Sequence, residues 1–120
     1  MSTRCHVIVT KNNPNKYLIG GDKGYVYRHH DGYPSTTGED LRNFISKNKE
    51  KIKNWSVEDF CNNLSKYNDQ YEYENCGVHG DEEYIYFIDL DTNKFECYSI
   101  LNYIASEDVS NDVRIFNENF

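Results

Sequence analysis

The chain has 120 residues, a formal net charge of −7 and a mean hydropathy of −0.86. This length is typical of one domain with its own core, so we expect residues 1–120 to form a single domain. No apolar run is long enough to cross a membrane, and no apolar signal region follows Met1. We therefore expect a cytoplasmic protein that has no membrane partner.

Charge is distributed unevenly along the chain. Residues 1–53 contain 10 Lys and Arg against 5 Asp and Glu, whereas residues 54–120 contain 3 against 15. An anionic partner is therefore expected to contact the first half, or one of the late cations Lys94 and Arg114. Duplex DNA requires many cationic contacts, so the acidic second half argues against DNA binding.

The first part of the chain predicts strands. Residues 3–9 alternate in polarity, which indicates a strand with Cys5, Val7 and Val9 on one face. Asn and Pro gather at residues 11–15 and predict a turn. Residues 17–28 are expected to form a hairpin around the glycine-rich segment 20–24.

Two helices are expected in the middle of the chain. The first begins near Thr37, which has the capping-box spacing with Asp40, and the second begins at Ser56, which has it with Asp59. Trp55 is placed to pack against the second helix as a hydrophobic staple. The side chains expected to face the core are Leu41, Phe44, Ile45 and Ile52, then Val57, Phe60, Cys61, Leu64 and Tyr67.

Residues 68–74 are polar and are expected to be irregular, whereas residues 84–90 and 94–100 form the clearest predicted hairpin. The first strand of this hairpin is apolar on both faces. This indicates a central strand, covered by helices on one side and by another layer, such as a partner subunit, on the other. Residues 113–116 are expected to add an edge strand. The order of elements predicts an α+β fold with a mainly antiparallel sheet and two central helices.

A dense group of polar side chains follows the strand that ends near residue 28. It consists of Arg28, His29, His30, Asp31 and Tyr33. A guanidinium matches phosphate, imidazoles donate hydrogen bonds to oxygen acceptors, and a carboxylate accepts them from ribose hydroxyls. Residues 35–37 lead into a helix N-terminus, which favours an anion. This loop is the candidate ligand site; the competing interpretation is a polar turn whose side chains bond only one another.

Metal and cysteine chemistry are weaker alternatives. Adjacent His and Asp occur in metal-dependent phosphohydrolases, but only His6 and His79 remain as further histidines, and Cys76 with His79 lacks two more zinc ligands. The cysteines at positions 5, 61 and 97 fall in strand or helix patterns and are expected to be reduced and packed in the core. Cys76 stays open as a nucleophile. We predict no metal site, no cofactor and no catalytic residue.

Two segments of the chain resemble a known family. They are Thr3, Arg4 and Cys5, and then Tyr27, Arg28, His29, His30, Asp31, Gly32, Tyr33 and Pro34, followed by Thr37 and Gly38. In these segments, in size and in element order, the chain is similar to the type-one Thoeris anti-defence proteins of phages and prophages. The resemblance rests mainly on the first 40 residues or so.

The resemblance implies a binding protein rather than an enzyme. Members of that family bind and sequester glycocyclic ADP-ribose, the signal made by a host TIR protein, and some hold cyclic oligonucleotides at separate sites. They assemble from dimers into hexamers, with pockets at subunit interfaces. In this chain the resemblance implies phosphate contacts from Arg28 and Arg114, with Asn93, Phe95 and Tyr98 as further contacts.

Two other functions remain open from the sequence. One is a His/Asp-dependent phosphodiesterase that degrades such a signal. The other is an acidic mimic of nucleic acid that inhibits a host defence enzyme, with the acidic second half as the mimicking surface. The function expected first is a homo-oligomer that binds a small cyclic nucleotide without cleaving it.

Overall fold

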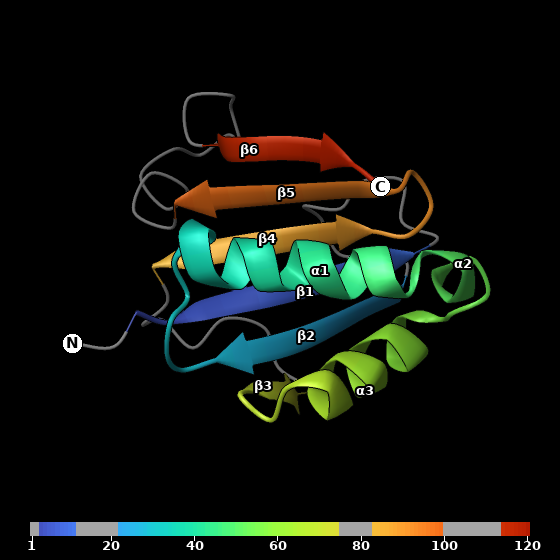
Figure 1. Ribbon diagram of the computed structural model, residues 1–120, viewed down its shortest axis with the longest axis horizontal. Helices are drawn as coiled ribbons and strands as arrows, with labels where there is room; N and C mark the ends of the chain where they lie inside the picture. Colours follow the sequence, from blue (N-terminus) through green and yellow to red (C-terminus); the bar gives the residue numbers. More distant parts are fainter. Residues whose placement is uncertain (1–2, 12–21, 75–82, 100–113) are drawn as a thin grey trace.

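A six-stranded sheet carries the helices on one face (Figure 1). The computed structural model describes residues 3–11, 22–74, 83–99 and 114–120. The strands are β1 (Cys5–Lys11), β2 (Asp22–Arg28), β3 (Tyr71–Glu74), β4 (Tyr84–Asp89), β5 (Lys94–Ser99) and β6 (Arg114–Asn119). The helices are η1, a π-helical turn (Pro34–Gly38), then α1 (Glu39–Lys47), α2 (Lys49–Ile52) and α3 (Val57–Tyr67).

The strands lie in the order β3-β2-β1-β4-β5-β6. β1 and β4 are parallel, with Cys5 opposite Tyr84, and the other four neighbouring pairs are antiparallel. The prediction of an α+β fold with a mainly antiparallel sheet is therefore confirmed. The predicted hairpin is present as β4 and β5. β4 lies inside the sheet, as its two apolar faces indicate, and β6 is an edge strand.

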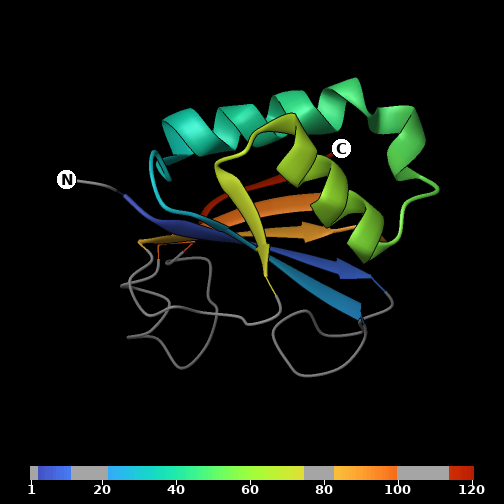
Figure 2. The same cartoon turned by 90° about the horizontal axis from the view of Figure 1, so that it is seen from below.

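The three α-helices lie on the same face of the sheet (Figure 2). α1 runs above the central strands, and α3 lies over β2 and β3 (Figure 1). At the start of α3, Ser56 Oγ accepts a hydrogen bond from the Asp59 amide at 3.1 Å, and the Asp59 carboxylate accepts one from the Ser56 amide at 3.0 Å. Trp55 packs edge-on against Phe60 with ring centroids 6.0 Å apart. The predicted capping box and staple are both confirmed.

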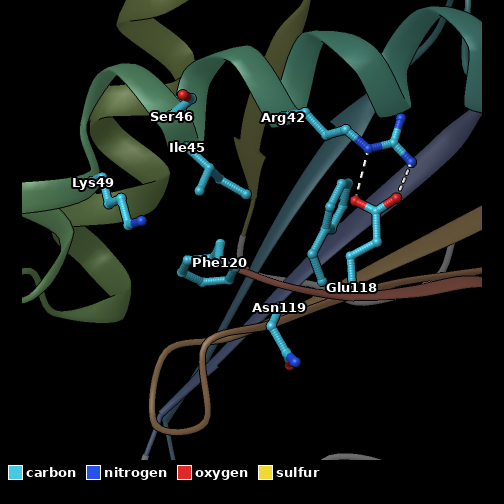
Figure 3. A pocket seen from close by; sticks show the side chains of 8 residues that line it. Arg42, Ile45, Ser46, Lys49, Glu118, Asn119 and Phe120 are labelled. Carbon is cyan, nitrogen blue, oxygen red and sulfur yellow. Dashed lines mark hydrogen bonds and ion pairs between the residues drawn. The ribbon is translucent and has the colours of Figure 1, made fainter.

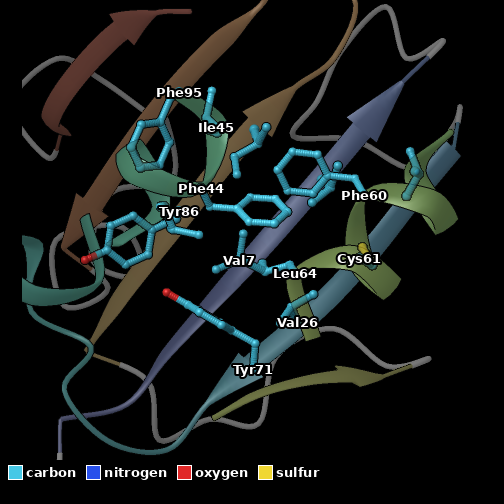
Figure 4. Close-up of a cluster of buried hydrophobic side chains, with 14 of the residues drawn as sticks. Val7, Val26, Phe44, Ile45, Phe60, Cys61, Leu64, Tyr71, Tyr86 and Phe95 are labelled. Carbon is cyan, nitrogen blue, oxygen red and sulfur yellow. The ribbon is translucent and has the colours of Figure 1, made fainter. Parts of the chain in front are cut away.

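The main core lies between the helices and the sheet (Figure 4). The helices contribute Leu41, Phe44, Ile45, Ile52, Val57, Phe60, Cys61 and Leu64, and the strands contribute Cys5, Val7, Val9, Val26, Tyr71, Tyr86, Ile88, Phe95 and Cys97. The apolar stripes read from the sequence thus face the sheet, except for Tyr67, which is 38% exposed. Within the described ranges no helix is long and apolar enough to cross a membrane.

The opposite face of the sheet is also buried. Ile8, Ile85, Phe87 and Tyr98 form a second cluster there, and His6, Thr10 and Glu96 are buried on the same face. These side chains are buried in the single chain. Their burial therefore does not require the partner subunit that the sequence suggested as a cover.

Three local expectations need correction. Thr37 does not cap a helix: the helical segment already begins at Pro34, and the Thr37 hydroxyl bonds backward to the carbonyl of Asp31. Residues 71–74 are not irregular but form β3, which pairs with β2. Of the hairpin expected over residues 17–28, the second strand is present as β2, whereas residues 17–19 lie outside the described ranges.

Candidate functional site

The loop of residues 29–33 joins β2 to the helical turn η1. Asp31 has a φ of +60°, in the left-handed region. Gly32 lies against the first residues of the chain: its amide donates to the Thr3 carbonyl at 2.9 Å, and a Cβ at this position would lie 2.9 Å from the same oxygen. The tight path of the backbone therefore requires glycine at position 32 and favours a residue such as Asp at position 31.

Three consecutive carbonyl groups of this loop accept hydrogen bonds from side chains of the protein. Nε of Arg28 donates to the His30 carbonyl at 2.8 Å, and Oγ1 of Thr37 donates to the Asp31 carbonyl at 2.5 Å. The Tyr86 hydroxyl donates to the Gly32 carbonyl at 2.8 Å. Each bond satisfies a backbone acceptor and fixes its direction, so the loop backbone is held in one path.

Arg28 is only 4% exposed and lies in a polar network under the loop. Its Nη1 donates to the Tyr71 hydroxyl at 2.9 Å and to Oδ2 of Asp40 at 3.3 Å, and its guanidinium lies 4.9 Å from the Tyr71 ring centroid. Tyr71 in turn donates to Asp40 at 2.6 Å. Burial and this bond raise the pKa of Tyr71, so the phenol stays protonated and keeps its donor. In this arrangement Arg28 positions the loop.

The side chains of the loop itself face solvent. His29, His30 and Asp31 are exposed, and Tyr33 is 47% exposed. The rings of His29 and His30 lie at right angles with centroids 4.6 Å apart. The structure therefore leaves four of the predicted site residues exposed on one short loop, whereas Arg28 is buried.

Three other predicted site residues lie elsewhere. Asn93, with a φ of +57°, is in the turn between β4 and β5, at the end of the sheet opposite the loop. Tyr98 is 1% exposed on the face away from the helices, where its hydroxyl donates to Glu96 at 2.5 Å. Arg114 pairs through its backbone with Tyr98, at the same end of the sheet as the loop. Four strand spacings separate β6 from β2, so Arg114 lies about 19 Å away along the sheet.

Three of the four cysteines are buried thiols, and Cys76 lies outside the described ranges. Cys5, Cys61 and Cys97 are all fully buried, which confirms their expected place in the core. Burial raises the pKa of Cys61 and of Cys97 to about 12. A nucleophilic cysteine needs a lowered pKa, so these two thiols are inert at neutral pH. Among the described residues, no three His, Cys, Asp or Glu side chains gather as a metal site would require.

A separate cavity of about 270 Å³ opens between α1 and the end of β6 (Figure 3). Its lining residues are Arg42, Ile45, Ser46, Lys49, Phe95, Glu118, Asn119 and Phe120. At one wall, Arg42 donates to Glu118 through Nε at 2.7 Å and Nη2 at 2.5 Å, and its guanidinium lies 4.6 Å from the Phe116 ring. The bond to Glu118 raises the pKa of Arg42. None of the lining residues belongs to the loop of residues 29–33, so the cavity is distinct from the loop. Of the residues that the resemblance implies, only Phe95 lines it.

Several residues that build the loop were not predicted as part of it. From β4, Tyr86 bonds to Gly32, and from α1 and β3, Asp40 and Tyr71 bond to Arg28. Contacts between residues so far apart in the sequence leave no local pattern from which they could be predicted. The burial of Arg28, by contrast, could have been predicted from the sequence. In a strand, Val26 and Arg28 share one face, so a buried Val26 places Arg28 on the side of the core.

Comparison with known proteins gives no further constraint. The chain matches no family model, and no curated protein and no solved structure is significantly similar to it.

Proposed function

We propose that the chain binds a small anionic nucleotide signal at the loop of residues 28–33 and holds it without cleaving it. The observation that carries this proposal is the fixing of three consecutive loop carbonyls by Arg28, Thr37 and Tyr86. A loop held in this way needs little ordering when a ligand binds, and a preorganised site binds more tightly for the same contacts.

The exposed side chains supply the recognition chemistry. Imidazoles can donate to phosphate oxygens, the Asp31 carboxylate can accept from ribose hydroxyls, and the half-exposed ring of Tyr33 can stack on a base. The ligand class that the resemblance implies, glycocyclic ADP-ribose, contains all three of these groups. In this proposal the protein acts as a phage anti-defence sponge in the cytoplasm of the host.

The second half of the site would come from another copy of the chain. Within one protomer the backbone of Arg114 lies four strand spacings from β2, and Asn93 lies at the end of the sheet opposite the loop. If they contribute, as the resemblance implies, they do so across a subunit interface of a dimer or a larger assembly. A single protomer would then bind weakly, and affinity would depend on protein concentration.

The test is calorimetric titration of the intact protein with glycocyclic ADP-ribose, followed by heating and mass analysis of the released ligand. We expect binding and recovery of the intact ligand. An Asp31→Asn variant keeps a residue that tolerates positive φ but loses the charge, so we expect about tenfold weaker binding. Glu58→Gln, which removes one negative charge from an exposed position at the start of α3, is the matched control and should bind like the wild type.

Two results would replace this proposal with its rivals. Recovery of a cleaved ligand would indicate a phosphodiesterase. Binding that is absent in the wild type, together with inhibition of a host defence enzyme that Glu82→Gln and Glu83→Gln abolish, would indicate an acidic nucleic-acid mimic.

A further inference from the structure

The cavity between α1 and the end of β6 has apolar walls. Ile45 is 4% exposed and Phe95 is 2% exposed, and both line the cavity together with the half-buried ring of Phe120. Ile45 points from α1 toward Phe120 across this space (Figure 3). An apolar cavity of about 150 Å³ can hold benzene, so a volume of about 270 Å³ has room for a bicyclic ring.

An ion pair between α1 and β6 forms one end of the cavity. Arg42 donates to one oxygen of Glu118 through Nε at 2.7 Å and to the other through Nη2 at 2.5 Å, and its Nη1 is bonded to Glu39. The guanidinium is thus occupied by two carboxylates of the protein. The pair ties the helix to the edge strand, so the cavity is already formed before any ligand binds.

Lys49 carries the unbalanced charge of the lining. Two cations, Arg42 and Lys49, and one carboxylate, Glu118, line the cavity, and Arg42 and Glu118 neutralise each other. Within the described ranges, no carboxylate lies within ion-pair distance of Lys49 Nζ. The Lys49 side chain is exposed and is directed toward Phe120 (Figure 3). Ser46, three positions earlier in the chain, places an exposed hydroxyl at the same mouth.

We propose that this cavity binds a small aromatic carboxylate, with its ring between Ile45, Phe95 and Phe120 and its carboxylate at Lys49. This site is separate from the loop and does not depend on the proposed function. Two of the three apolar walls are phenylalanine rings, which favour edge-on or offset contacts with another ring. The ammonium of Lys49 and the hydroxyl of Ser46 are donors that suit a carboxylate.

The position of the charge keeps the cost of binding low. Lys49 and Ser46 are exposed, so the ligand carboxylate stays at the mouth and keeps part of its hydration. Only the ring is removed from water, and the burial of apolar area drives binding. A ligand of this shape without the charge would bury the same ring but would leave Lys49 without a partner.

Binding is tested by nuclear magnetic resonance of the full chain with ¹³C-labelled isoleucine methyl groups, with indole-3-acetate as the probe. The ring current of the bound indole should shift the methyl signals of Ile45 in a saturable manner. Ile115, which is 49% exposed on β6 and does not line the cavity, should not shift. The neutral analogue indole-3-acetamide should bind about threefold to fivefold more weakly, as expected for loss of an exposed ion pair.

A pair of lysine variants tests the charge. In Lys49→Gln, the affinity for indole-3-acetate should fall about threefold to fivefold, and the preference over indole-3-acetamide should disappear. Lys51→Gln makes the same change of charge at an exposed position of α2 outside the cavity, and it should bind like the wild type. Octanoate, an aliphatic carboxylate, should bind more weakly than indole-3-acetate.

Three results would overturn the proposal. No shift of Ile45 with indole-3-acetate at millimolar concentration would mean that the cavity is not a site for this class of ligand. Equal affinity for the carboxylate and the amide in the wild type would remove the role of Lys49. Tighter binding of octanoate would overturn the aromatic class. None of the lining residues belongs to the loop of residues 29–33, so each of these results leaves the proposed function of the loop unaffected.

Discussion

The Tyr86 hydroxyl, fully buried on β4, donates a hydrogen bond of 2.8 Å to the carbonyl of Gly32 in the loop. A Tyr86→Phe substitution keeps the ring in the core but leaves a buried carbonyl without this donor. We expect the free energy of unfolding to fall by about 1–2 kcal/mol. Ligand affinity should fall as well, because the loop loses one of its three side-chain supports.

Urea denaturation and calorimetric titration measure these two effects. Tyr73→Phe on β3 is the matched control, since Tyr73 is 39% exposed and lies on the edge of the sheet. It should change neither quantity by more than about 0.5 kcal/mol. Unaltered stability in Tyr86→Phe would mean that the carbonyl of Gly32 finds water or another donor.

Arg28→Lys tests whether Arg28 positions the loop or contacts ligand directly. Lysine cannot reach the His30 carbonyl, Asp40 and Tyr71 at the same time, because it lacks the forked guanidinium. We expect a loss of about 2–3 kcal/mol in the free energy of unfolding. A double-mutant cycle with Asp40→Asn should give a coupling energy of about 1 kcal/mol or more.

The opposite result would also be informative. If Arg28→Lys unfolds at the same urea concentration as the wild type but no longer binds nucleotide, Arg28 contacts the ligand itself. Arg28 would then have to leave its present contacts on binding.

The buried thiols predict loss of stability at alkaline pH. Burial raises the pKa of Cys61 and Cys97 from 9.0 to about 12, so the folded state favours the protonated thiols. Their contribution is fully present below pH 9 and is lost as the pH rises from 9 toward 12. The slope is about 1.4 kcal/mol per pH unit for each thiol. Urea denaturation at pH 8, 9.5 and 10.5 measures it, and Cys97→Ala should show a smaller slope than the wild type.

Gly24 is required by the close packing of α3 on β2. A Cβ at this position would lie 2.6 Å from Sγ of Cys61 and 2.7 Å from Cγ1 of Val57. Gly24→Ala should therefore lower the free energy of unfolding by about 1–3 kcal/mol. Gly38→Ala is the control: the nearest atom, on Phe116, is 3.6 Å away, and φ is −58°. It should be neutral or slightly stabilising in thermal unfolding, because alanine favours a helix.

The elements with regular local patterns could be predicted from the sequence. The alternation of residues 3–9 predicts the strand that forms β1. The two apolar faces of residues 84–90 predict that β4 lies inside the sheet, and the spacing of Ser56 and Asp59 predicts the start of α3. β3 was not predicted although Tyr71–Glu74 alternates tyrosine with glutamate, because the segment has only four residues and follows a polar stretch. It becomes a strand because Tyr71 packs into the core and pairs with Arg28.

The exposure of the polar loop could be predicted from the sequence, but the contacts that hold its backbone could not. The polar loop could be located because its side chains are adjacent in the sequence, and they do face solvent. The groups that hold it come from Tyr86 on β4 and from Thr37, and the bond from Arg4 to His29 spans 25 positions. Such contacts depend on the tertiary fold, which periodicity alone does not specify.

The single parallel pair, β1 with β4, divides the sheet into two parts of consecutive sequence. β3, β2 and β1 come from residues 5–74, and β4, β5 and β6 come from residues 84–119. Cys5 and Tyr84, which face each other at this junction, are about 80 positions apart, so closing it carries a large loop entropy. The two parts should therefore gain their hairpins early, and their joining should limit the rate of folding. The Tyr86 hydroxyl on β4 donates to the Gly32 carbonyl across that junction, so the loop gains this support only in the last step.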